Sequence, residues 1–378
     1  MPKQKKPLPA VRDSTTIVFA TNRQRLSDGF WEDADIVAGT IQRLWLGRAR
    51  IGWVGDPMET ESGRQLLEAA EVSGEDDFAD PAAGSCAAVL DAWLADAAAR
   101  QAVPVFYIHG FSNGFADALQ RAAQIEEFYE GEKLALAPLV FSWPSDGRVL
   151  DPQLFAADTG VKAQYLDDQR DAMASAPALA RLLREIWRAK TRATAAGGTS
   201  PRLMLLAHSM GNLALASGLA AMNNGLLTRE LAGLFAHAVL ASADVPHTCF
   251  EPGQPMRLLP LIAEQVTVCI SHDCTLSIAS QFANGNRRLG HYGPASLDLL
   301  PPGVEVVDYF IGLDATSRDR ILTKGGTEWD VVQHQWYRND LKARAALAAL
   351  FEGRKPPHKP LAAELRVDAG RSRHAFLG

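Results

Sequence analysis

The sequence predicts an α/β fold in which a mostly parallel central sheet carries helices on both faces. From about residue 86 onward, short apolar runs of strand length alternate with helical segments. Several runs are continuously apolar, as expected for parallel strands buried on both faces. The chain has 378 residues, 47% of them hydrophobic and 22% charged, which suits a large globular core.

The expected strands begin with a β-branched run at 15–21 and a second strand or hairpin at 44–54. Further strands are expected at 103–109, 139–143, 203–208, 234–241, 265–271 and 303–310. Pro144 ends the strand at 139–143, because proline cannot donate a hydrogen bond to a sheet ladder.

The expected helices are of Ala-rich or amphipathic character. They cover residues 62–70, 86–100, 115–129, 167–190, 213–223 and 339–351. The helix at 86–100 places Val89, Leu90 and Trp93 on one face, and the helix at 167–190 is long and amphipathic.

Composition excludes several classes of protein. The net charge of −6 gives no electrostatic reason to expect nucleic acid as a partner. No apolar run is long enough to cross a bilayer, and no apolar signal region follows the basic residues 1–12. The four cysteines lack the spacing of a metal site or disulfide framework; they are Cys86, Cys249, Cys269 and Cys274. We therefore expect a cytoplasmic protein with reduced thiols and no membrane span.

Residues 203–212, Leu-Met-Leu-Leu-Ala-His-Ser-Met-Gly-Asn, carry the strongest functional signal. An apolar run ends at Ser209 and a helical pattern starts at once, which is the strand–turn–helix of an α/β-hydrolase nucleophile elbow. The strained turn tolerates only small residues two before and two after the serine, and Ala207 and Gly211 occupy these positions. The pattern predicts an α/β-hydrolase fold with Ser209 as nucleophile.

A serine nucleophile needs an imidazole within hydrogen-bond reach and a carboxylate that fixes the tautomer of that imidazole. In α/β-hydrolases the chain order is serine, acid, histidine. Only His334 lies after the last expected strand and before the closing helix, so it is the predicted base; the alternative is an ordinary loop histidine. The other eight are a core residue (His237) and turn, loop or tail residues: His109, His208, His247, His272, His291, His358 and His374.

Two carboxylates compete for the role of acid. Asp273 follows the strand at 265–271 and Asp244 follows the strand at 234–241. The acid most often follows the second strand after the nucleophile, which favours Asp273; its alternative role is a helix N-cap. Asp244 is expected to line or order the site. Weaker candidates are Asp308, Asp314 and Asp330.

An oxyanion hole requires fixed N–H donors. The N–H of Met210, directly after the nucleophile, is one expected donor. The second is expected from the loop His109-Gly110-Phe111, where Gly110 allows close approach and Phe111 N–H is the preferred donor.

The candidate substrate-binding residues are Trp143, His208 and Asp244. Trp143 and Phe111 would give an aromatic wall near Ser209, although buried aromatics at such positions are as often core residues. No two histidines and a carboxylate share a ligand-like spacing, so no metal and no cofactor is expected.

Further motifs occur in order along the chain. They are Phe-Ala-Thr-Asn-Arg at 19–23, Ile-His-Gly-Phe at 108–111 with Asn113 and Phe115, Phe-Ser-Trp-Pro-Ser at 141–145, Tyr165 with Asp168, Leu-Ala-His-Ser-Met-Gly-Asn at 206–212, Ala-Ser-Ala-Asp at 241–244, and Ser271, Asp273 and Leu276. With these motifs the chain resembles, from about residue 15 to 350, a bacterial family of uncharacterised α/β-hydrolase esterases, formerly catalogued as a domain of unknown function. The resemblance implies carboxylesterase activity with Ser209, Asp273 and His334 as triad, and it implies no particular substrate.

The α/β-hydrolase domain is expected over 15–352, after a disordered arm at 1–14 and before a basic tail at 353–378. Within it, 56–100 is a candidate insertion or rim region, since 56–80 is acidic and largely irregular.

The expected reaction is hydrolysis of small or medium carboxylic esters through an acyl-enzyme, with a small-molecule ester as partner. Acyl transfer or lactone or amide hydrolysis by the same triad is an alternative. A non-catalytic interaction module on the same fold is another. The sequence leaves the oligomeric state open.

Overall fold

A computed structural model describes most of the chain between residues 14 and 356. The described ranges are 14–26, 29–30, 44–53, 64–66, 71–76, 85–145, 159–197, 199–222, 229–271, 275–309 and 334–356. Residues 1–13 of the predicted arm at 1–14 lie outside these ranges, and so do residues 357–378 of the predicted tail at 353–378.

The central sheet of the described residues has ten strands in the order β12-β11-β10-β9-β7-β8-β1-β4-β5, with β6 paired to β4. Its strands are β1 Ser14–Thr21, β4 Leu44–Trp53, β5 Arg64–Leu66, β6 Glu71–Asp76, β7 Val103–Ile108, β8 Leu136–Ser142, β9 Met204–His208, β10 His237–Ala241, β11 Val266–Ile270 and β12 Val304–Asp308. All neighbouring strands from β12 to β1 are parallel, whereas β4, β5 and β6 pair antiparallel at one edge. Strands β2 Arg25–Leu26 and β3 Gly29–Phe30 form a separate hairpin.

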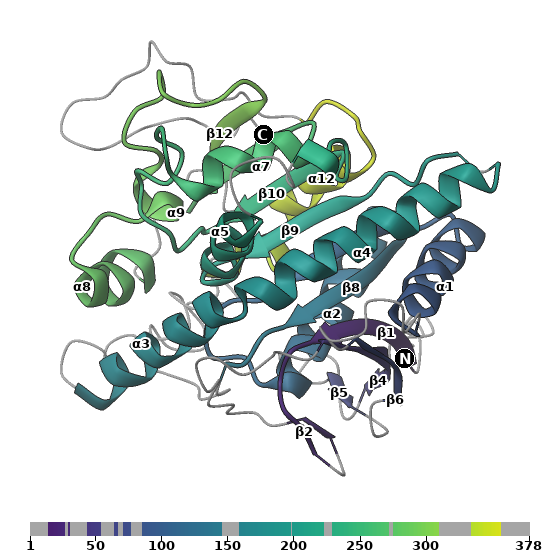
Figure 1. Ribbon diagram of the computed structural model, residues 1–378. Coiled ribbons are helices and arrows are strands. Elements are labelled where there is room, and N and C mark those ends of the chain that lie inside the picture. The colour runs from purple at the N-terminus through teal and green to yellow at the C-terminus, as the bar shows by residue number, and fades with distance from the viewer. Residues whose placement is uncertain are drawn as a thin grey trace, which may run out of the picture.

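Helices cover both faces of this sheet (Figure 1). They are α1 Ser85–Ala99, α2 Phe115–Glu130, α3 Thr159–Ala174, α4 Ala176–Ala195, α5 Gly211–Ala221, α7 Leu259–Ile262, α8 Gln281–Asn284, α9 Leu289–Tyr292 and α12 Leu341–Phe351, with short turns η1 Pro255–Leu258, η2 Thr275–Ser280 and η4 Trp336–Arg338. Helices α1, α4 and α5 bury Leu90, Leu182 and Leu215 in one core. Helices α2 and α12 bury Leu119 and Leu347 in a second core. The structure thus confirms the predicted α/β fold and explains the continuously apolar strands, which are buried on both faces.

The helix expected at 62–70 is wrong, because residues 64–66 form strand β5. Leu66 lies opposite Ile51 of β4, and β6 pairs with the same strand further along. The free edge of β4 offers backbone hydrogen bonds that a weak local helical pattern cannot outweigh. The described parts of 56–100 therefore extend the sheet and, in α1, pack against α4.

The long helix expected at 167–190 consists of two helices, α3 and α4, which are separated at Ser175. Pro177 lies at the start of α4. Proline lacks an N–H, but no hydrogen bond is lost there, because the N–H groups of the first helical turn have no partner within the helix. In a continuous helix its ring would collide with the carbonyl four residues earlier. Ser175 Oγ donates to the carbonyl of Asp171 at 2.7 Å and so satisfies the broken end of α3.

None of the described helices has both the length and the apolar character that a membrane-spanning helix needs. The described cysteines Cys86, Cys249 and Cys269 are buried and form no disulfide within the described residues, and Cys274 lies outside these residues.

Candidate active site

Ser209 sits in a strained turn between β9 and α5. Its backbone φ of +50° lies in the left-handed region, which non-glycine residues seldom adopt. Such a conformation costs on the order of 1–3 kcal/mol and persists only where its surroundings hold it. Ser209 N–H donates to the carbonyl of Ala241 at 3.0 Å, and the carbonyl of Ser209 accepts from the N–H of Asn212 at 3.0 Å. The strand–turn–helix expected around Ser209 is therefore present.

Two glycines allow the backbone to approach Ser209 closely. A Cβ at Gly211 would lie 2.5 Å from the carbonyl oxygen of His109 and 2.6 Å from that of Ile108. A Cβ at Gly110 would lie 2.9 Å from Ser209 Cβ. Side chains at these positions would push the elbow away from the loop after β7.

The structure brings the predicted base to the predicted nucleophile. His334 Nε2 lies 2.9 Å from Ser209 Oγ, although the residues are 125 positions apart in the sequence. Ser209 is 4% exposed and His334 is 7% exposed, so the contact is almost entirely shielded from water. At this distance a histidine can remove the proton of a serine hydroxyl.

The main chain of His334 is itself held in place. His208 Nε2 donates to the carbonyl of His334 at 3.0 Å, and the His208 ring lies 4.7 Å from the His334 ring and 4.7 Å from the Tyr337 ring. Ser242 Oγ donates to the same carbonyl at 3.3 Å and accepts from Trp336 Nε1 at 3.0 Å. The ends of β9 and β10 thus fix the segment that carries His334.

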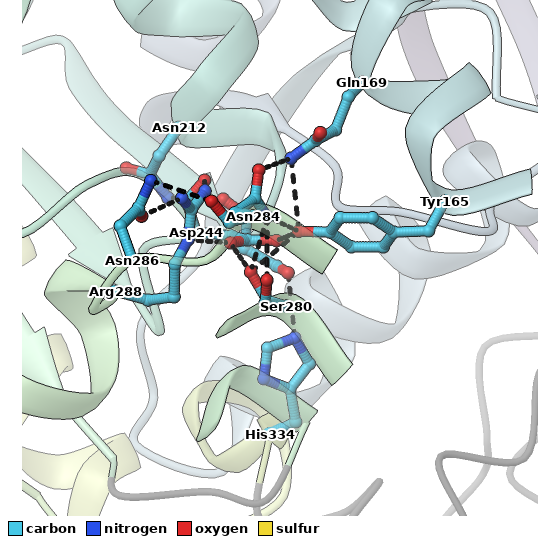
Figure 2. Close-up of polar contacts among 10 residues, drawn as sticks. Tyr165, Gln169, Asn212, Asp244, Ser280, Asn284, Asn286, Arg288 and His334 are labelled. Atoms are coloured by element: carbon cyan, nitrogen blue, oxygen red, sulfur yellow. Dashed lines mark hydrogen bonds and ion pairs between the residues drawn. The ribbon is translucent and has the colours of Figure 1, made fainter. Parts of the chain in front are cut away.

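The predicted acid, Asp273, lies outside the described residues. Its competitor Asp244 is described, and its N–H donates to the carbonyl of Ser209 at 3.1 Å. Its carboxylate, however, accepts from the hydroxyls of Tyr165 and Ser280 and belongs to a buried network (Figure 2). Within the described residues, no hydrogen bond joins this carboxylate to the His334 ring. Asp308 is buried at the carboxyl end of β12.

A buried ion pair lies at the centre of the network around Asp244. Arg288 Nε donates to Asp244 Oδ1 at 2.7 Å, and both side chains are 2% exposed. Burial lowers the pKa of the Arg288 guanidinium, but the charge of Asp244 and its hydrogen bond to Arg288, with contributions from Tyr165 and Cys249, together outweigh this effect and the pKa is raised. Burial and the charge of Asp244 both raise the pKa of Tyr165 well above its ordinary value, so its hydroxyl stays protonated and donates. The observed contacts of Asp244 are therefore those of an ordered, charged structural group.

Among the described residues, the two predicted oxyanion donors have no competing acceptor. Neither Phe111 N–H nor Met210 N–H donates a hydrogen bond within the part of the chain that the structure describes. Met210 is buried directly after Ser209 at the start of α5, and Phe111 follows Gly110, which touches the elbow. Unpaired amides beside a nucleophile suit the stabilisation of an oxyanion.

His109 and Trp143 support the loop after β7. Trp143 is fully buried, donates from Nε1 to the carbonyl of His109 at 2.9 Å, and stacks on the His109 ring with centroids 5.0 Å apart. Burial and the positive charge of Arg23 lower the pKa of His109 from 6.5 to about 3. The neutral ring donates from Nδ1 to the carbonyl of Gly110 at 2.8 Å.

Sequence reasoning missed the roles of several residues that the structure places beside the site. Arg288 has no local signal, because its partner Asp244 lies 44 positions away. The motif of Tyr165 with Asp168 gave no role for either residue, and Gln169 was missed, although the three residues place polar groups on one face of a helix at spacings of three and four.

No group of three or more His, Cys, Asp or Glu side chains that could hold a metal ion occurs among the described residues.

The comparison with known families agrees with this geometry. The model of a family described as "Alpha/beta hydrolase of unknown function (DUF900)" matches residues 86–319, well over half of the chain. The match includes Ser209, Phe111 and Met210, whereas His334 and the strands β1 and β4 lie outside it. No curated relative matches the chain.

Proposed function

The chain belongs to this α/β-hydrolase family of unknown function, and we propose that it is a serine carboxylesterase. The contact of 2.9 Å between Ser209 Oγ and His334 Nε2 carries the proposal. The positive φ of Ser209 supports it, as do the amides of Phe111 and Met210, which donate no hydrogen bond to any described residue.

In the proposed reaction, Ser209 Oγ attacks the ester carbonyl carbon while His334 Nε2 takes the hydroxyl proton. The N–H groups of Phe111 and Met210 stabilise the oxyanion of the tetrahedral intermediate. When the C–O bond of the ester breaks, the leaving alcohol takes the proton from His334. Water, deprotonated by His334, then attacks the acyl-enzyme, and the carboxylic acid and free Ser209 result. Asp273 holds His334 in the tautomer that this cycle requires.

The nucleophile is tested with Ser209→Ala. We expect the turnover of a p-nitrophenyl short-acyl ester to fall by roughly 10³-fold or more, with thermal unfolding unchanged. A fluorophosphonate probe should label the wild-type protein at Ser209 and leave the variant unlabelled. Wild-type turnover in the variant, or no labelling of the wild type, would overturn the proposal; absence of labelling would favour a non-catalytic interaction module.

The base is tested with His334→Gln, and His247→Gln is the matched control. His247 is a half-buried histidine without a hydrogen bond to Ser209 or His334 in the described residues. The His334 variant should lose both turnover and fluorophosphonate labelling, and the control should keep both. Equal activities in the two variants would exclude His334 as base.

The acid is tested by comparing Asp273→Asn with Asp244→Asn and Asp308→Asn. Loss of the correct acid should lower kcat by roughly 10⁴-fold, because the imidazole then adopts the wrong tautomer. We expect this loss at Asp273. A larger loss of kcat in Asp244→Asn or Asp308→Asn, in a variant that still unfolds cooperatively, would assign the role of acid to that residue instead.

Hydrolysis is distinguished from acyl transfer by product analysis in the presence of an added alcohol or amine. A panel of esters, lactones and amides gives the preferred substrate class.

The substrate-binding roles of Trp143, His208 and Asp244 remain predictions, since the described contacts of these three residues are with protein groups. The cytoplasmic location also remains a prediction.

A further inference from the structure

We propose that Asn113 is a positioning residue that aims the Phe111 N–H at the oxyanion, and that Asp168, Ser145 and Arg23 hold Asn113 in place. This inference rests on the proposed function, because it assigns a role within the same site. The segment concerned, residues 110–114, is called the oxyanion loop below.

The direction of the Phe111 N–H is set by the carbonyl on the other side of the same peptide bond. A trans peptide is planar, so the N–H of Phe111 points opposite to the carbonyl of Gly110. That carbonyl accepts from Asn113 Nδ2 at 3.1 Å and from His109 Nδ1 at 2.8 Å. Asn113 Nδ2 also donates to the carbonyl of Phe111 at 2.8 Å and so fixes the next peptide plane. The Asn113 amide therefore holds both peptide planes that flank Phe111.

The main chain of the oxyanion loop is held from helix α3. Asp168 Oδ2 accepts from the N–H of Ser112 at 3.2 Å and from the hydroxyl of Ser145. Ser145 Oγ in turn accepts from the N–H of Asn113 at 3.1 Å. Asp168 is 1% exposed and Ser145 is fully buried, so these bonds form where water cannot replace them.

Arg23 holds the same loop from the end of β1. Its Nη2 donates to the carbonyl of Asn113 at 2.8 Å and its Nη1 to the carbonyl of Ser145 at 2.9 Å. Its Nε donates to Ser142 Oγ at 2.9 Å, and the side chain is fully buried. A planar guanidinium with donors in fixed directions suits three simultaneous acceptors of this kind.

The backbone of the oxyanion loop is strained, which explains why it needs such support. Ser112 has a φ of +57°, in the left-handed region. A strained conformation persists only where surrounding contacts fix it, and here Asp168 binds Ser112 N–H while Arg23 and Ser145 bind the main chain of Asn113. Without these contacts the loop could relax and the Phe111 N–H would turn away from the substrate.

The test compares an oxygen ester with its thionoester in which sulfur replaces the carbonyl oxygen. Sulfur accepts hydrogen bonds weakly, so the preference for the oxygen ester reports on the oxyanion donors. The variants are Asn113→Asp, which keeps the shape and loses the donating NH₂ group, and Asp168→Asn. Asp167→Asn is the matched control, because Asp167 is the next residue and forms an exposed ion pair with Arg170.

We expect Asn113→Asp to lower kcat by roughly 10- to 100-fold with little change in KM, and to lower the preference for the oxygen ester by a similar factor. Asp168→Asn should change both quantities in the same direction and Asp167→Asn should change neither. If Asp168→Asn does not unfold cooperatively, Ser145→Ala is used instead. It removes the hydrogen bonds of Ser145 Oγ to Asp168 and to the N–H of Asn113 and leaves the charge of Asp168 in place.

Wild-type kcat in Asn113→Asp would overturn the inference. So would a fall in kcat with an unchanged preference for the oxygen ester, because a loss of folded protein lowers the rates for both esters equally. A wild-type protein that hydrolyses neither ester and is not labelled by a fluorophosphonate would overturn the proposed function, and this inference with it.

Discussion

Three serines around the site have a backbone conformation that side chains usually avoid. Ser209 at the end of β9, Ser242 at the end of β10 and Ser112 after β7 have φ values of +50°, +46° and +57°. Each conformation costs free energy, and strain of this kind clusters where function requires an unusual backbone direction. Ser242 holds the main chain of His334, and Ser112 belongs to the oxyanion loop. At the residue scale, the site is built from strained turns that close contacts hold in place.

Gly211→Ala tests how closely the elbow packs. The new Cβ would meet the backbone carbonyls of His109 and Ile108 at 2.5 and 2.6 Å, and these atoms cannot move without shifting β7. We expect a loss of about 1–3 kcal/mol in the free energy of unfolding and a fall in kcat of more than about tenfold. Urea unfolding and ester hydrolysis give the two quantities.

Gly218→Ala in the same helix is the matched control. The three atoms nearest to its Cβ would all belong to the side chain of Leu179, which can adjust, and alanine favours the helix by up to about 1 kcal/mol. Equal losses in the two variants would show that the elbow has no special requirement at Gly211.

The pKa of His109 makes stability depend on pH. Its value of about 3 in the folded protein lies below the ordinary 6.5, so the unfolded chain binds more protons between these values. The contribution of His109 to stability is present above pH 6.5 and is lost as the pH falls towards 3. Down to pH 4 the loss is on the order of 3 kcal/mol. Urea unfolding of His109→Gln should therefore show a weaker pH dependence than the wild type over this range; parallel curves would contradict the shifted pKa.

At the scale of elements, the Asp244–Arg288 pair joins segments that are distant in sequence. Asp244 follows β10, Arg288 precedes α9, and the hydroxyls that complete the network come from Tyr165 of α3 and Ser280 of η2. A buried ion pair is not by itself strongly stabilising, but removing one partner leaves an uncompensated charge. The pair thus makes the positions of α3 and η2 depend on β10, the strand that follows Ser209.

Arg288→Met tests this dependence. The buried carboxylate of Asp244 would lose its cation, and we expect the free energy of unfolding to fall by about 3–5 kcal/mol. The double variant Arg288→Met with Asp244→Asn should be less destabilised, because neither charge remains. Urea unfolding of both variants measures the difference; a loss below about 1 kcal/mol in Arg288→Met would show that the pair is not effectively buried.

At the scale of the whole molecule, the site depends on parts of the chain outside the family match at 86–319. Strand β1 lies inside the sheet between β8 and β4, and Arg23 at its end reaches the oxyanion loop. His334 follows the last described strand, and its ring lies against Ser209. The N-terminal and C-terminal segments are therefore as necessary to the proposed chemistry as the matched centre.

Truncation of the N-terminus tests this arrangement. A chain that starts at Ser14 should unfold cooperatively, because it retains β1. A chain that starts at Arg25 loses a strand with the buried residues Ile17 and Phe19, exposes the edge of β8, and should aggregate. Calorimetry and size-exclusion chromatography measure both outcomes; a well-folded chain from Arg25 would show that β1 is dispensable.

Prediction from sequence succeeded where one segment contains the whole signal. The buried strands of the sheet and the elbow at Ser209 follow from local apolar runs and small residues, and the structure has them. Prediction failed at 64–66, where pairing with β4 decides the conformation, and at Ser175, where the expected helix is divided just before the proline in the first turn of α4. It also missed Arg288, whose role depends on a residue 44 positions away.

The sequence by itself determined the fold class, the order of the parallel strands along the chain, and the positions of Ser209 and His334 relative to them, because these depend on local composition and chain order. Only the tertiary structure decided that His334 Nε2 reaches Ser209 Oγ, that the Asp244 carboxylate pairs with Arg288, and that Asn113 holds the Gly110 carbonyl. These are contacts between side chains or loops with individual geometries, and hydrogen bonds form only within a few tenths of an ångström of a preferred distance. The spacing of residues in a chain carries no information at that precision.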